Sequence, residues 1–466
     1  MESNRQKNIE NNRLEYGKAY DTLTFIGVEQ AREAEKIKVD LIDSLTGKVT
    51  WGFNRTKLDC QNLSNGCRLC GEGTWSCLFI NGICNAHCFY CPSEQSSKSE
   101  PMTNGIPFGN PKDYIEYIRH FKFRGIGISG GEPLVTFDRT FRYISEIKKA
   151  FGDNIYLWLY TNGILADREK LSMLKSAGLD EIRFDLSACC YQLDKVKIAV
   201  ETIPVVTVEI PAIPEDEALL KTVIVRINRL GVSHLNLHQL RCTPYNRERL
   251  VQRGYTFLHG PKVTVLESEL CALRMIRFVY ENNIELPINY CAFAYKHRHQ
   301  GAGIRKRLAT FFQKSYETIT ETGMVRTLSV KGTPKEMIDA AERFESIGSS
   351  KYHWELTGAK TRLYFHESLW QHIDFTTTPL LVSYFGLHLR PSLSYRNAFR
   401  EIRLNSKKPI YIEKLGVLLD RELKGEAANW FIKRFIQEQT DLTSEETGPA
   451  EINELERIRP DLQDYY

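Results

Sequence analysis

Apolar runs of strand length alternate with amphipathic helical patterns through the first two thirds of the chain. Asp138 opens one helical pattern that places Phe141, Ile144 and Ile147 on roughly one face and stops at Gly152. The six β-rich runs are Leu78–Ile83, Gly125–Ser129, Ile155–Tyr160, Glu181–Leu186, Val205–Ile210 and His234–Leu240. This alternation predicts an α/β fold with a parallel sheet and right-handed crossovers. Six units suit an open, partial (β/α)6 barrel better than a closed barrel of eight strands.

The alternation ends near residue 300, and the rest of the chain predicts an α+β domain that presents substrate. Arg305–Arg307 begins a basic helix, and Ile410–Leu419 fits a strand or a helix. The other predicted elements are strands at Met324–Lys331, Leu363–Phe365 and Leu380–Tyr384, helices at Pro334–Phe344 and Ala427–Gln437, and a loose acidic tail. We therefore divide the chain into an N-terminal extension (1–58), a cysteine-rich metal-binding segment (59–78), the partial barrel (79–300) and the C-terminal domain (301–466).

Composition adds limits on location and partners. A chain of 466 residues is longer than one core supports, and 62 basic against 58 acidic side chains leave a net charge of only +4. Nucleic acid is therefore neither supported nor excluded as a partner. No stretch reaches the roughly 18 apolar residues of a membrane helix, and the first residues contain no signal-peptide core. We expect a cytoplasmic protein without a membrane partner, whose 12 cysteines are metal ligands or buried thiols.

Three cysteines lie close together in the spacing C-x3-C-x2-C, namely Cys84, Cys88 and Cys91. Three thiolates leave one iron of a four-iron cube without a protein ligand, and that iron can chelate a small molecule. A soft thiolate set on a short loop favours an iron–sulfur cluster over a hard cation. A zinc loop is the alternative for the triplet taken alone.

A glycine turn follows about forty residues later, in the run Gly130-Gly131-Glu132-Pro133 after an apolar strand. Two residues without Cβ let a small ligand lie against bare backbone, and Glu132 offers an acceptor for a cationic amine. The alternative is a plain tight turn.

The cysteine triplet and the GGEP turn, in this order, resemble the signature of the radical S-adenosylmethionine (SAM) superfamily, including the aromatic Tyr90 before the last cysteine. The resemblance covers roughly residues 60–300. It implies a partial (β/α)6 barrel, a SAM-binding [4Fe–4S] cluster on the three cysteines, and binding of the SAM amino group at GGEP. Within the superfamily the chain resembles proteins related to pyruvate formate-lyase activating enzyme. Those proteins place extra cluster ligands after the core loop, which puts a glycyl-radical activase role in doubt.

The resemblance also implies a mechanism and a partner. SAM would bind the open iron through its amino and carboxylate groups, and one electron from the reduced cluster would cleave it to methionine and a 5′-deoxyadenosyl radical. That radical would abstract a hydrogen atom from an unidentified substrate. A low-potential donor such as ferredoxin or flavodoxin would reduce the cluster. A radical SAM methyltransferase and a non-catalytic iron–sulfur or zinc protein are the alternative functions.

Polar residues leave the predicted strands at the edge where barrel chemistry gathers. Thr161 and Asn162 are similar to a TNG stretch of the superfamily, whose polar groups reach ribose or carboxylate. Asp185 and Ser187 share a strand face with Arg183, which is costly to bury unless it pairs or binds ligand. His238 is polar on the last predicted strand. We expect these side chains to line the cofactor cavity, with salt-bridged or hydrogen-bonded structural roles as the alternative.

A second cysteine group lies upstream in the spacing C-x6-C-x2-C-x6-C, namely Cys60, Cys67, Cys70 and Cys77. Zinc sites usually show two CxxC pairs or histidines, and one CxxC occurs here. We therefore favour an auxiliary [4Fe–4S] cluster over zinc, with Cys60 the least secure ligand.

Two further cysteines map to probable strand ends, Cys242 and Cys291. A thiol at the mouth of the barrel could donate a hydrogen atom to a substrate radical or ligate another cluster, so both are candidate catalytic residues. The alternative for each is a small buried hydrophobe.

Overall fold

The computed structural model describes residues 2–97, 99–439 and 449–466 and forms two compact units. The first unit comprises the described residues through Thr103, together with Pro107–Gln300 and Pro460–Tyr466. The second comprises Asn104–Ile106 and the described part of Gly301–Arg459. The finer division of the N-terminal part into an extension, a cysteine-rich segment and a barrel stays a prediction.

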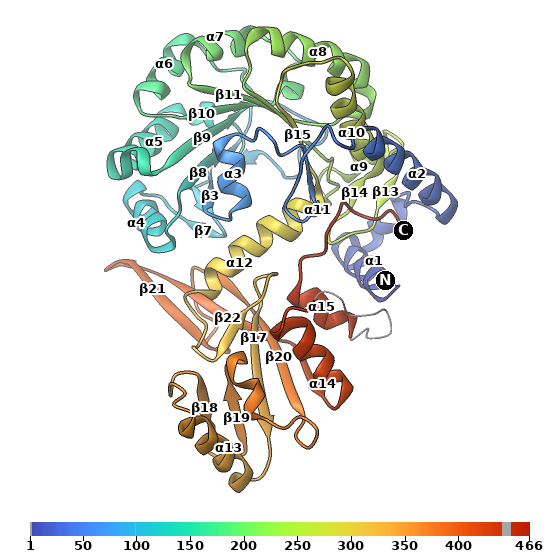
Figure 1. Ribbon diagram of the computed structural model, residues 1–466. Helices are drawn as coiled ribbons and strands as arrows, with labels where there is room; N and C mark the ends of the chain where they lie inside the picture. The colour runs from blue at the N-terminus through green and yellow to red at the C-terminus, as the bar shows by residue number, and fades with distance from the viewer. Residues whose placement is uncertain (1, 98, 440–448) are drawn as a thin grey trace. The chain divides into compact units, whose positions relative to one another are not determined.

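A curved sheet of parallel strands is the centre of the first unit (Figure 1). Its strands lie side by side in chain order: β3 (Trp75–Phe79), β8 (Gly125–Ser129), β9 (Tyr156–Thr161), β10 (Glu181–Phe184), β11 (Val205–Pro211), β12 (His234–His238) and β15 (Ile288–Cys291). All neighbouring pairs in this series are parallel. The predicted α/β barrel is thereby confirmed, and β15 extends the six predicted strands by a seventh.

The first predicted strand, Leu78–Ile83, differs from the structure. β3 begins at Trp75 and ends at Phe79, and Gly82–Ile83 forms a separate strand, β4, that pairs with β5 (Ser96–Ser97). The Asn81 side chain separates the two strands, because its amide donates to the Glu132 carbonyl at 3.0 Å while its oxygen accepts from the Ile83 amide at 3.0 Å. The chain therefore turns out of the sheet just before Cys84.

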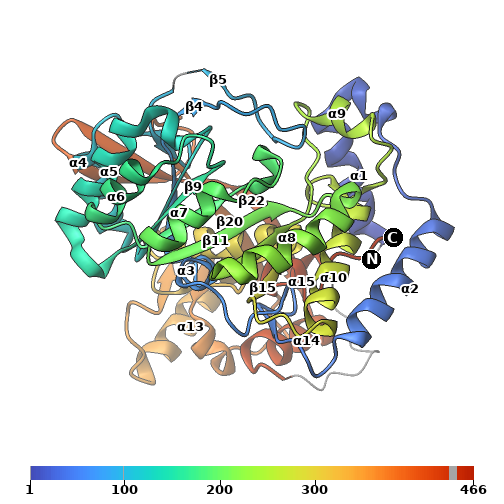
Figure 2. The same cartoon turned by 90° about the horizontal axis from the view of Figure 1, so that it is seen from above.

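Amphipathic helices cover the convex face of the sheet (Figures 1 and 2). They are α4 (Pro111–Phe121), α5 (Phe137–Phe151), α6 (Arg168–Ser176), α7 (Asp194–Thr202), α8 (Glu217–Leu230) and α10 (Leu266–Glu281). Side-chain caps begin α4 and α6, where Asn110 and Asp167 accept backbone hydrogen bonds. These helices leave the concave face free for other elements.

The short helix α3 (Asn65–Gly71) lies on the concave side of the sheet (Figure 1). Its N-cap Ser64 accepts a hydrogen bond from the Arg183 guanidinium of β10 at 3.1 Å. Gly66 packs so closely that a Cβ there would lie 2.4 Å from an Arg183 nitrogen. α3 therefore fills part of the barrel interior and carries Cys67 and Cys70 into it.

Further elements of the first unit flank this sheet. β1 (Trp51–Gly52) and β2 (Lys57–Leu58) are antiparallel to each other, and β2 is antiparallel to β15. The remaining helices and strands include α1 (Glu2–Tyr16), α2 (Val28–Ser44), α9 (Arg247–Val251), α11 (Phe293–Tyr295), β6 (Met102–Thr103), β13 (Phe257–Leu258) and β14 (Thr264–Val265).

The second unit is an antiparallel sheet with helices, in agreement with the predicted α+β class. Its strands are β16 (Glu317–Ile319), β17 (Val325–Lys331), β18 (Trp354–Leu356), β19 (Arg362–Phe365), β20 (Leu380–Arg390), β21 (Phe399–Asn405) and β22 (Lys408–Leu423). Its helices are α12 (Gly301–Ala309), α13 (Pro334–Ser346), α14 (Glu426–Phe431), a π-helical turn at Ile432–Ile436 and α15 (Ala450–Glu456). The ambiguous segment Ile410–Leu419 is therefore a strand.

The predicted loose tail is wrong for its described part, while residues 440–448 lie outside the described residues. α15 buries Ile452, and near the end of the chain the Tyr465 hydroxyl donates to the buried Glu269 carboxylate at 2.8 Å. Apolar residues that recur every three or four positions in this acidic stretch supply that packing, namely Ile452, Leu455, Ile458, Leu462 and Tyr465.

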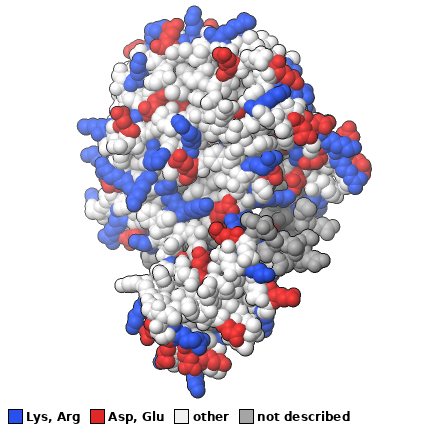
Figure 3. Space-filling view, in the orientation of Figure 1, with Lys and Arg blue, Asp and Glu red and all other residues white. Residues whose placement is uncertain are grey.

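Surface charge agrees with the small net charge. Basic and acidic side chains are interspersed over the face drawn in Figure 3. In the part of the chain that the structure describes, no helix is both long and apolar enough to cross a membrane.

Candidate active site

The three cysteines of the C-x3-C-x2-C motif lie on one partly exposed loop after β4. The Cys84 sulfur accepts hydrogen bonds from the Ala86 backbone amide at 3.4 Å and from the Asn162 side-chain amide at 3.7 Å. Burial raises the pKa of the Cys88 thiol to about 11. Burial also raises the pKa of the Cys84 thiol and outweighs the two amides directed at it. A positively charged partner would be needed to hold these sulfurs as thiolates.

The glycine turn docks against the base of this loop. The Gly131 and Glu132 amides donate to the carbonyls of Asn81 and Ile83 at 3.1 and 2.7 Å. A Cβ on Gly131 would lie 2.0 Å from the Ile83 carbonyl oxygen. The space that the sequence reserves for a ligand is therefore filled at Gly131 by the protein's own backbone. Because Gly131 has no side chain, the Ile83 backbone can lie against it, and this contact fixes the position of the chain just before Cys84.

Gly130 has a second backbone requirement, since its φ of 133° is one that side-chain-bearing residues rarely adopt. Pro133 follows the turn and is buried at the start of a 3-10 helix. Together these residues make a tight connection from β8 into α5.

The Glu132 carboxylate is almost completely buried, with 1% of the residue exposed. It accepts hydrogen bonds from the Leu134 amide at 2.9 Å, the Thr161 hydroxyl at 2.8 Å and the Asn162 amide at 2.7 Å. Burial outweighs these bonds and raises its pKa to about 6. Glu132 therefore ties the exit of β8 to the exit of β9, and its binding of an amine stays a prediction.

Asn162 joins the same exits to the cysteine loop. Its side-chain amide donates to the Asn85 side chain at 2.8 Å and points to Cys84, while its oxygen accepts from the Ile164 amide at 3.0 Å. The residue thus orients the first cysteine of the motif from the neighbouring strand.

Tyr90 is held by the exit of β10. Its hydroxyl lies 3.0 Å from the nearer Asp185 carboxylate oxygen and 2.6 Å from the Ser187 hydroxyl. Burial raises the pKa of Asp185. The predicted cofactor residues Asp185 and Ser187 are therefore brought to the loop, where they position its tyrosine.

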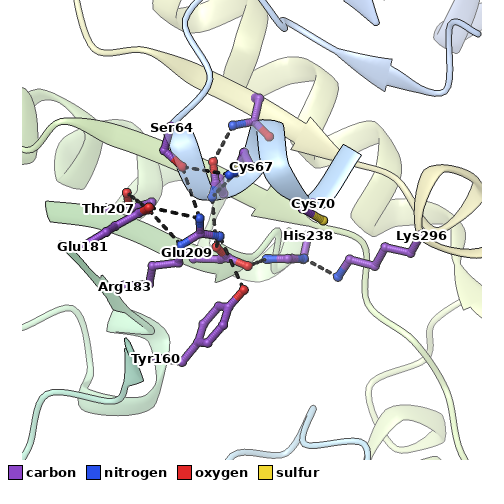
Figure 4. Close-up of polar contacts among 12 residues, drawn as sticks. Ser64, Cys67, Cys70, Tyr160, Glu181, Arg183, Thr207, Glu209, His238 and Lys296 are labelled. Atoms are coloured by element: carbon purple, nitrogen blue, oxygen red, sulfur yellow. Dashed lines mark hydrogen bonds and ion pairs between the residues drawn. The ribbon is translucent and has the colours of Figure 1, made fainter. Parts of the chain in front are cut away.

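Charged side chains fill the barrel interior between β10 and β12 (Figure 4). The Arg183 guanidinium pairs with Glu181 and with Glu209, each at 2.8 Å, so Arg183 is internal and not on an exterior strand end. Burial opposes ionisation of Glu209, but Arg183 and His238 hold its pKa well below the usual range. This layer is charged and internally paired.

His238 continues that layer. Its Nε2 lies 2.6 Å from Glu209, and Lys296 donates to its Nδ1 (Figure 4). Burial and then Lys296 lower the pKa of His238 to about 4. His238 is therefore neutral near pH 7, with its proton on Nε2. Glu209 and Lys296 were absent from the predicted site because no local motif marks them.

The upstream cysteines come from three elements. Cys67 and Cys70 lie on α3, Cys60 follows β2, and Cys77 lies within β3. The Asn236 amide donates to Cys67 at 3.4 Å, and the Tyr295 hydroxyl donates to Cys70 at 3.7 Å. Among the described residues, no three His, Cys, Asp or Glu side chains surround one point closely enough to hold a metal ion as they stand.

The two candidate catalytic cysteines lie in different surroundings. Cys242 is fully buried in an apolar cluster with Tyr16, Leu240 and Leu250, as the hydrophobic alternative expects. Burial raises its pKa to about 11. Cys291 ends β15 and is 8% exposed. Phe89 and Tyr90 of the cysteine loop pack on the same cluster, and the Thr243 hydroxyl and the Asn246 side-chain amide donate to the Pro92 and Tyr90 carbonyls at 2.8 and 2.9 Å.

The donor sets fit the cofactors that the resemblance implies. Three partly exposed thiols on one loop are soft ligands for iron, and an amide directed at Cys84 would stabilise a bound thiolate.

Comparison with known proteins gives the family. The model of the radical SAM superfamily matches residues 78–196. The "Putative glycyl-radical enzyme activating enzyme MJ0021" of Methanocaldococcus jannaschii is 31% identical over 301 residues, which cover 61% of this chain and 78% of that protein.

Solved structures match the chain at lower sequence identity. Streptococcus suis SuiB bound to SAM has a TM-score of 0.35 at 12% identity, over 63% of each chain. The radical SAM methyltransferase TsrM of Kitasatospora setae has a TM-score of 0.29 at 15% identity, over 39% of each chain. Both matches span less than two thirds of the solved chains.

Proposed function

Because the chain belongs to the radical SAM superfamily and is related to its activating enzymes, we propose that it abstracts a hydrogen atom from an unidentified substrate. Membership implies a [4Fe–4S] cluster and SAM. When bound, the reduced cluster supplies one electron to the SAM sulfonium, whose S–C5′ bond breaks to give methionine and a 5′-deoxyadenosyl radical. The remaining work belongs to residues of this chain.

Cys84, Cys88 and Cys91 would hold the SAM-binding cluster, since they lie on one partly exposed loop. The observation that carries this proposal is that two strand exits hold the cysteine loop, through contacts of Gly131 and Asn162. Gly131 docks its base on the exit of β8, and Asn162 directs an amide at Cys84 from the exit of β9. A loop fixed from two strands can present an open iron in one orientation.

The exits of β8 to β10 would bind and orient SAM next to that loop. Thr161, Asn162, Asp185 and Ser187 gather there with Gly130, and Tyr90 is fixed among them. Glu132 would act on SAM chiefly by positioning these exits, because its carboxylate already accepts three hydrogen bonds. The charged layer around His238 would line the substrate side of the barrel.

The upstream cysteines would hold an auxiliary metal centre, a [4Fe–4S] cluster in preference to zinc. Their position inside the barrel supports an electron-transfer or bracing role. A low-potential ferredoxin or flavodoxin would supply electrons. The printed name of the M. jannaschii relative makes a backbone glycine of a protein partner one substrate to test.

Anaerobic reconstitution with iron and sulfide, followed by dithionite and SAM, tests the proposal. We expect 5′-deoxyadenosine and methionine in equal amounts by mass spectrometry from the native protein. S-adenosylhomocysteine as the main product would replace hydrogen abstraction with methyl transfer. Intact clusters that neither bind nor cleave SAM would favour a non-catalytic iron–sulfur protein.

A further inference from the structure

A lysine is buried next to the upstream cysteines in the first unit. Lys57 of β2 is 1% exposed, and its ammonium lies 4.8 Å from the centre of the Tyr295 ring. Burial opposes its charge, and negative charge on the thiols Cys291, Cys67, Cys60 and Cys70 is what would raise its pKa above the ordinary value. The Lys57 ammonium and the Cys70 thiol thus contact the same Tyr295 side chain.

The fold brings these thiols together from distant parts of the chain. β2 pairs with β15 through Leu58 and Tyr290, so Lys57 and Cys291 adjoin one paired position on neighbouring strands. The Cys60 thiol lies 3.5 Å from the Lys57 carbonyl oxygen, to which it donates. Cys291 is thus joined to the upstream group by strand pairing rather than by sequence spacing.

Helix α3 supplies the other two thiols. Tyr295, four residues after Cys291, donates to Cys70 at 3.7 Å, and the Gln300 amide donates to the same sulfur. Cys67 accepts from Asn236, whose strand β12 lies directly beside β15. Three of the four sulfurs therefore have a donor or acceptor contact that fixes their direction.

Cys77 has different neighbours. The charged and thiol groups that act on it are Cys70, Glu209 and Arg183, and it pairs with Gly127 from β3, the first strand of the parallel series. Cys77 therefore faces the charged layer of the barrel, and Cys70 is the thiol that it shares with the group around Lys57.

The charge of Lys57 points to what the thiols bind. Among the described residues, no Asp or Glu side chain forms an ion pair with Lys57. An isolated ammonium is costly to bury, and neutral thiols compensate it poorly. Four thiolates on a [4Fe–4S] core carry a net charge of about −2, which a buried ammonium would balance.

We propose that Cys60, Cys67, Cys70 and Cys291 ligate an auxiliary iron–sulfur cluster whose negative charge is balanced by Lys57. Cys291 thereby replaces Cys77 in the ligand set predicted from spacing. Assembly releases the four thiol protons and draws the sulfurs around the cluster, while the ammonium stays beside it. The inference rests on the proposed auxiliary centre and is independent of SAM cleavage.

The test uses the full chain with Cys84, Cys88 and Cys91 changed to alanine, so that only the inner site can hold a cluster. After anaerobic reconstitution we expect about four irons and four sulfides per chain. Adding Cys291→Ser should reduce both to background, whereas Cys77→Ser and the buried control Cys271→Ser should leave them unchanged. Loss of iron in Cys77→Ser with retention in Cys291→Ser would overturn the proposal, as would zinc in place of iron.

A second measurement separates ligand loss from misfolding. In a chain with the motif cysteines intact, Cys291→Ser should lose about half of the iron yet keep a paramagnetic cluster signal that changes when SAM is added. Loss of both clusters together with the circular dichroism spectrum would identify a folding defect, and Cys291→Ala would then repeat the test. Retention of all iron in a folded Cys291→Ser chain would contradict the proposal.

Lys57 is tested as a positioning charge. Lys57→Met should shift the reduction potential of the inner cluster to more negative values, because the extra electron loses a nearby positive charge, and Lys57→Arg should restore it. An unchanged potential in Lys57→Met would contradict the counter-charge role. If the native protein forms no deoxyadenosine while the inner site still binds iron, the proposed catalysis fails and this inference stands.

Discussion

The two thiol groups of the first unit differ in how the chain builds them. Cys84, Cys88 and Cys91 lie within one eight-residue loop and are partly exposed. The group around Lys57 is assembled from β2, α3 and β15, and Cys67 and Cys291 within it are buried. A site on one loop can be read from spacing and remains open to a ligand. A site assembled by strand pairing is closed and becomes visible only in the fold.

Their surroundings differ in the same direction. In the outer loop, Cys84 accepts hydrogen bonds from a backbone amide and a side-chain amide, and the three cysteines remain partly exposed to solvent. Beside the inner group, the buried Lys57 ammonium contacts the Tyr295 ring. We infer that the outer site is built for exchange of a small molecule and the inner site for permanent occupancy.

The largest expected effect comes from removing an outer ligand. Cys84→Ala, Cys88→Ala or Cys91→Ala should each reduce deoxyadenosine formation to the detection limit, because a cluster with two thiolates is not retained in a form that binds SAM. The measurement is product mass spectrometry after dithionite reduction. Thermal unfolding should match the native apo-protein, and turnover in all three variants would remove the distinction between the two sites.

Gly131→Ala disrupts the packing of the outer loop against the glycine turn and leaves the three cysteines unchanged. A Cβ placed 2.0 Å from the Ile83 carbonyl oxygen should destabilise the first unit by about 3 kcal/mol. It should also lower SAM cleavage at least about tenfold by displacing Cys84. Denaturant unfolding and product assays measure the two effects.

Gly27→Ala is the matched control for this variant, since nothing lies within 4 Å of its added Cβ. Its stability should stay within about 0.5 kcal/mol of the native value. Equal stabilities for the two alanine variants would show that the close approach at Gly131 does not hold the loop.

The pH dependence of the unfolding free energy tests whether the Glu132 carboxylate is buried between the exits of β8 and β9. Its folded pKa of about 6 exceeds the ordinary 4.5, so its contribution is complete below pH 4.5 and is lost as the pH rises through 6. The stability of the native apo-protein relative to Glu132→Gln should therefore fall by about 2 kcal/mol between pH 4 and pH 7. Urea unfolding at each pH gives this difference, and a difference that rises with pH would contradict the assigned environment.

Tyr90→Phe should have the smallest effect. It removes the hydroxyl that contacts Asp185 and Ser187, at a cost of about 1 kcal/mol, and leaves the three cysteines in place. Urea unfolding should resolve that cost against exposed Tyr245→Phe, which we expect to be neutral. A loss above about 3 kcal/mol would mean that Tyr90 is a structural anchor of the loop and not a local support.

The sequence was sufficient for the parts of the fold and site that depend on local pattern. The six parallel strands follow from apolar runs and capped helices, and the outer cysteines from their spacing. β15 was not counted as a seventh unit, although Cys291 was placed near a strand end. Its four residues, Ile288–Cys291, give too short an apolar run to identify a strand by pattern alone.

Features that depend on distant partners could not be predicted. A lysine is ordinarily exposed, and although Cys60, Cys67 and Cys70 follow Lys57 in the chain, no local pattern indicates that Lys57 is buried or that Cys291 lies nearby. The glycine pair was correctly identified as a point of close approach. The group that approaches it is the Asn81–Ile83 backbone, where the sequence analysis expected a ligand. Arg183 illustrates the same limit, because its partner Glu209 lies on another strand.

Electron–nuclear double resonance with isotopically labelled SAM tests the central claim most directly. The reduced native protein is mixed with SAM carrying ¹⁵N in its amino group or ¹⁷O in its carboxylate. We predict hyperfine coupling from both labels to the outer cluster, retained in Cys291→Ser and absent in Cys88→Ala. A reduced, intact outer cluster that shows no coupling to either label would contradict the assignment of Cys84, Cys88 and Cys91 as the SAM-binding site.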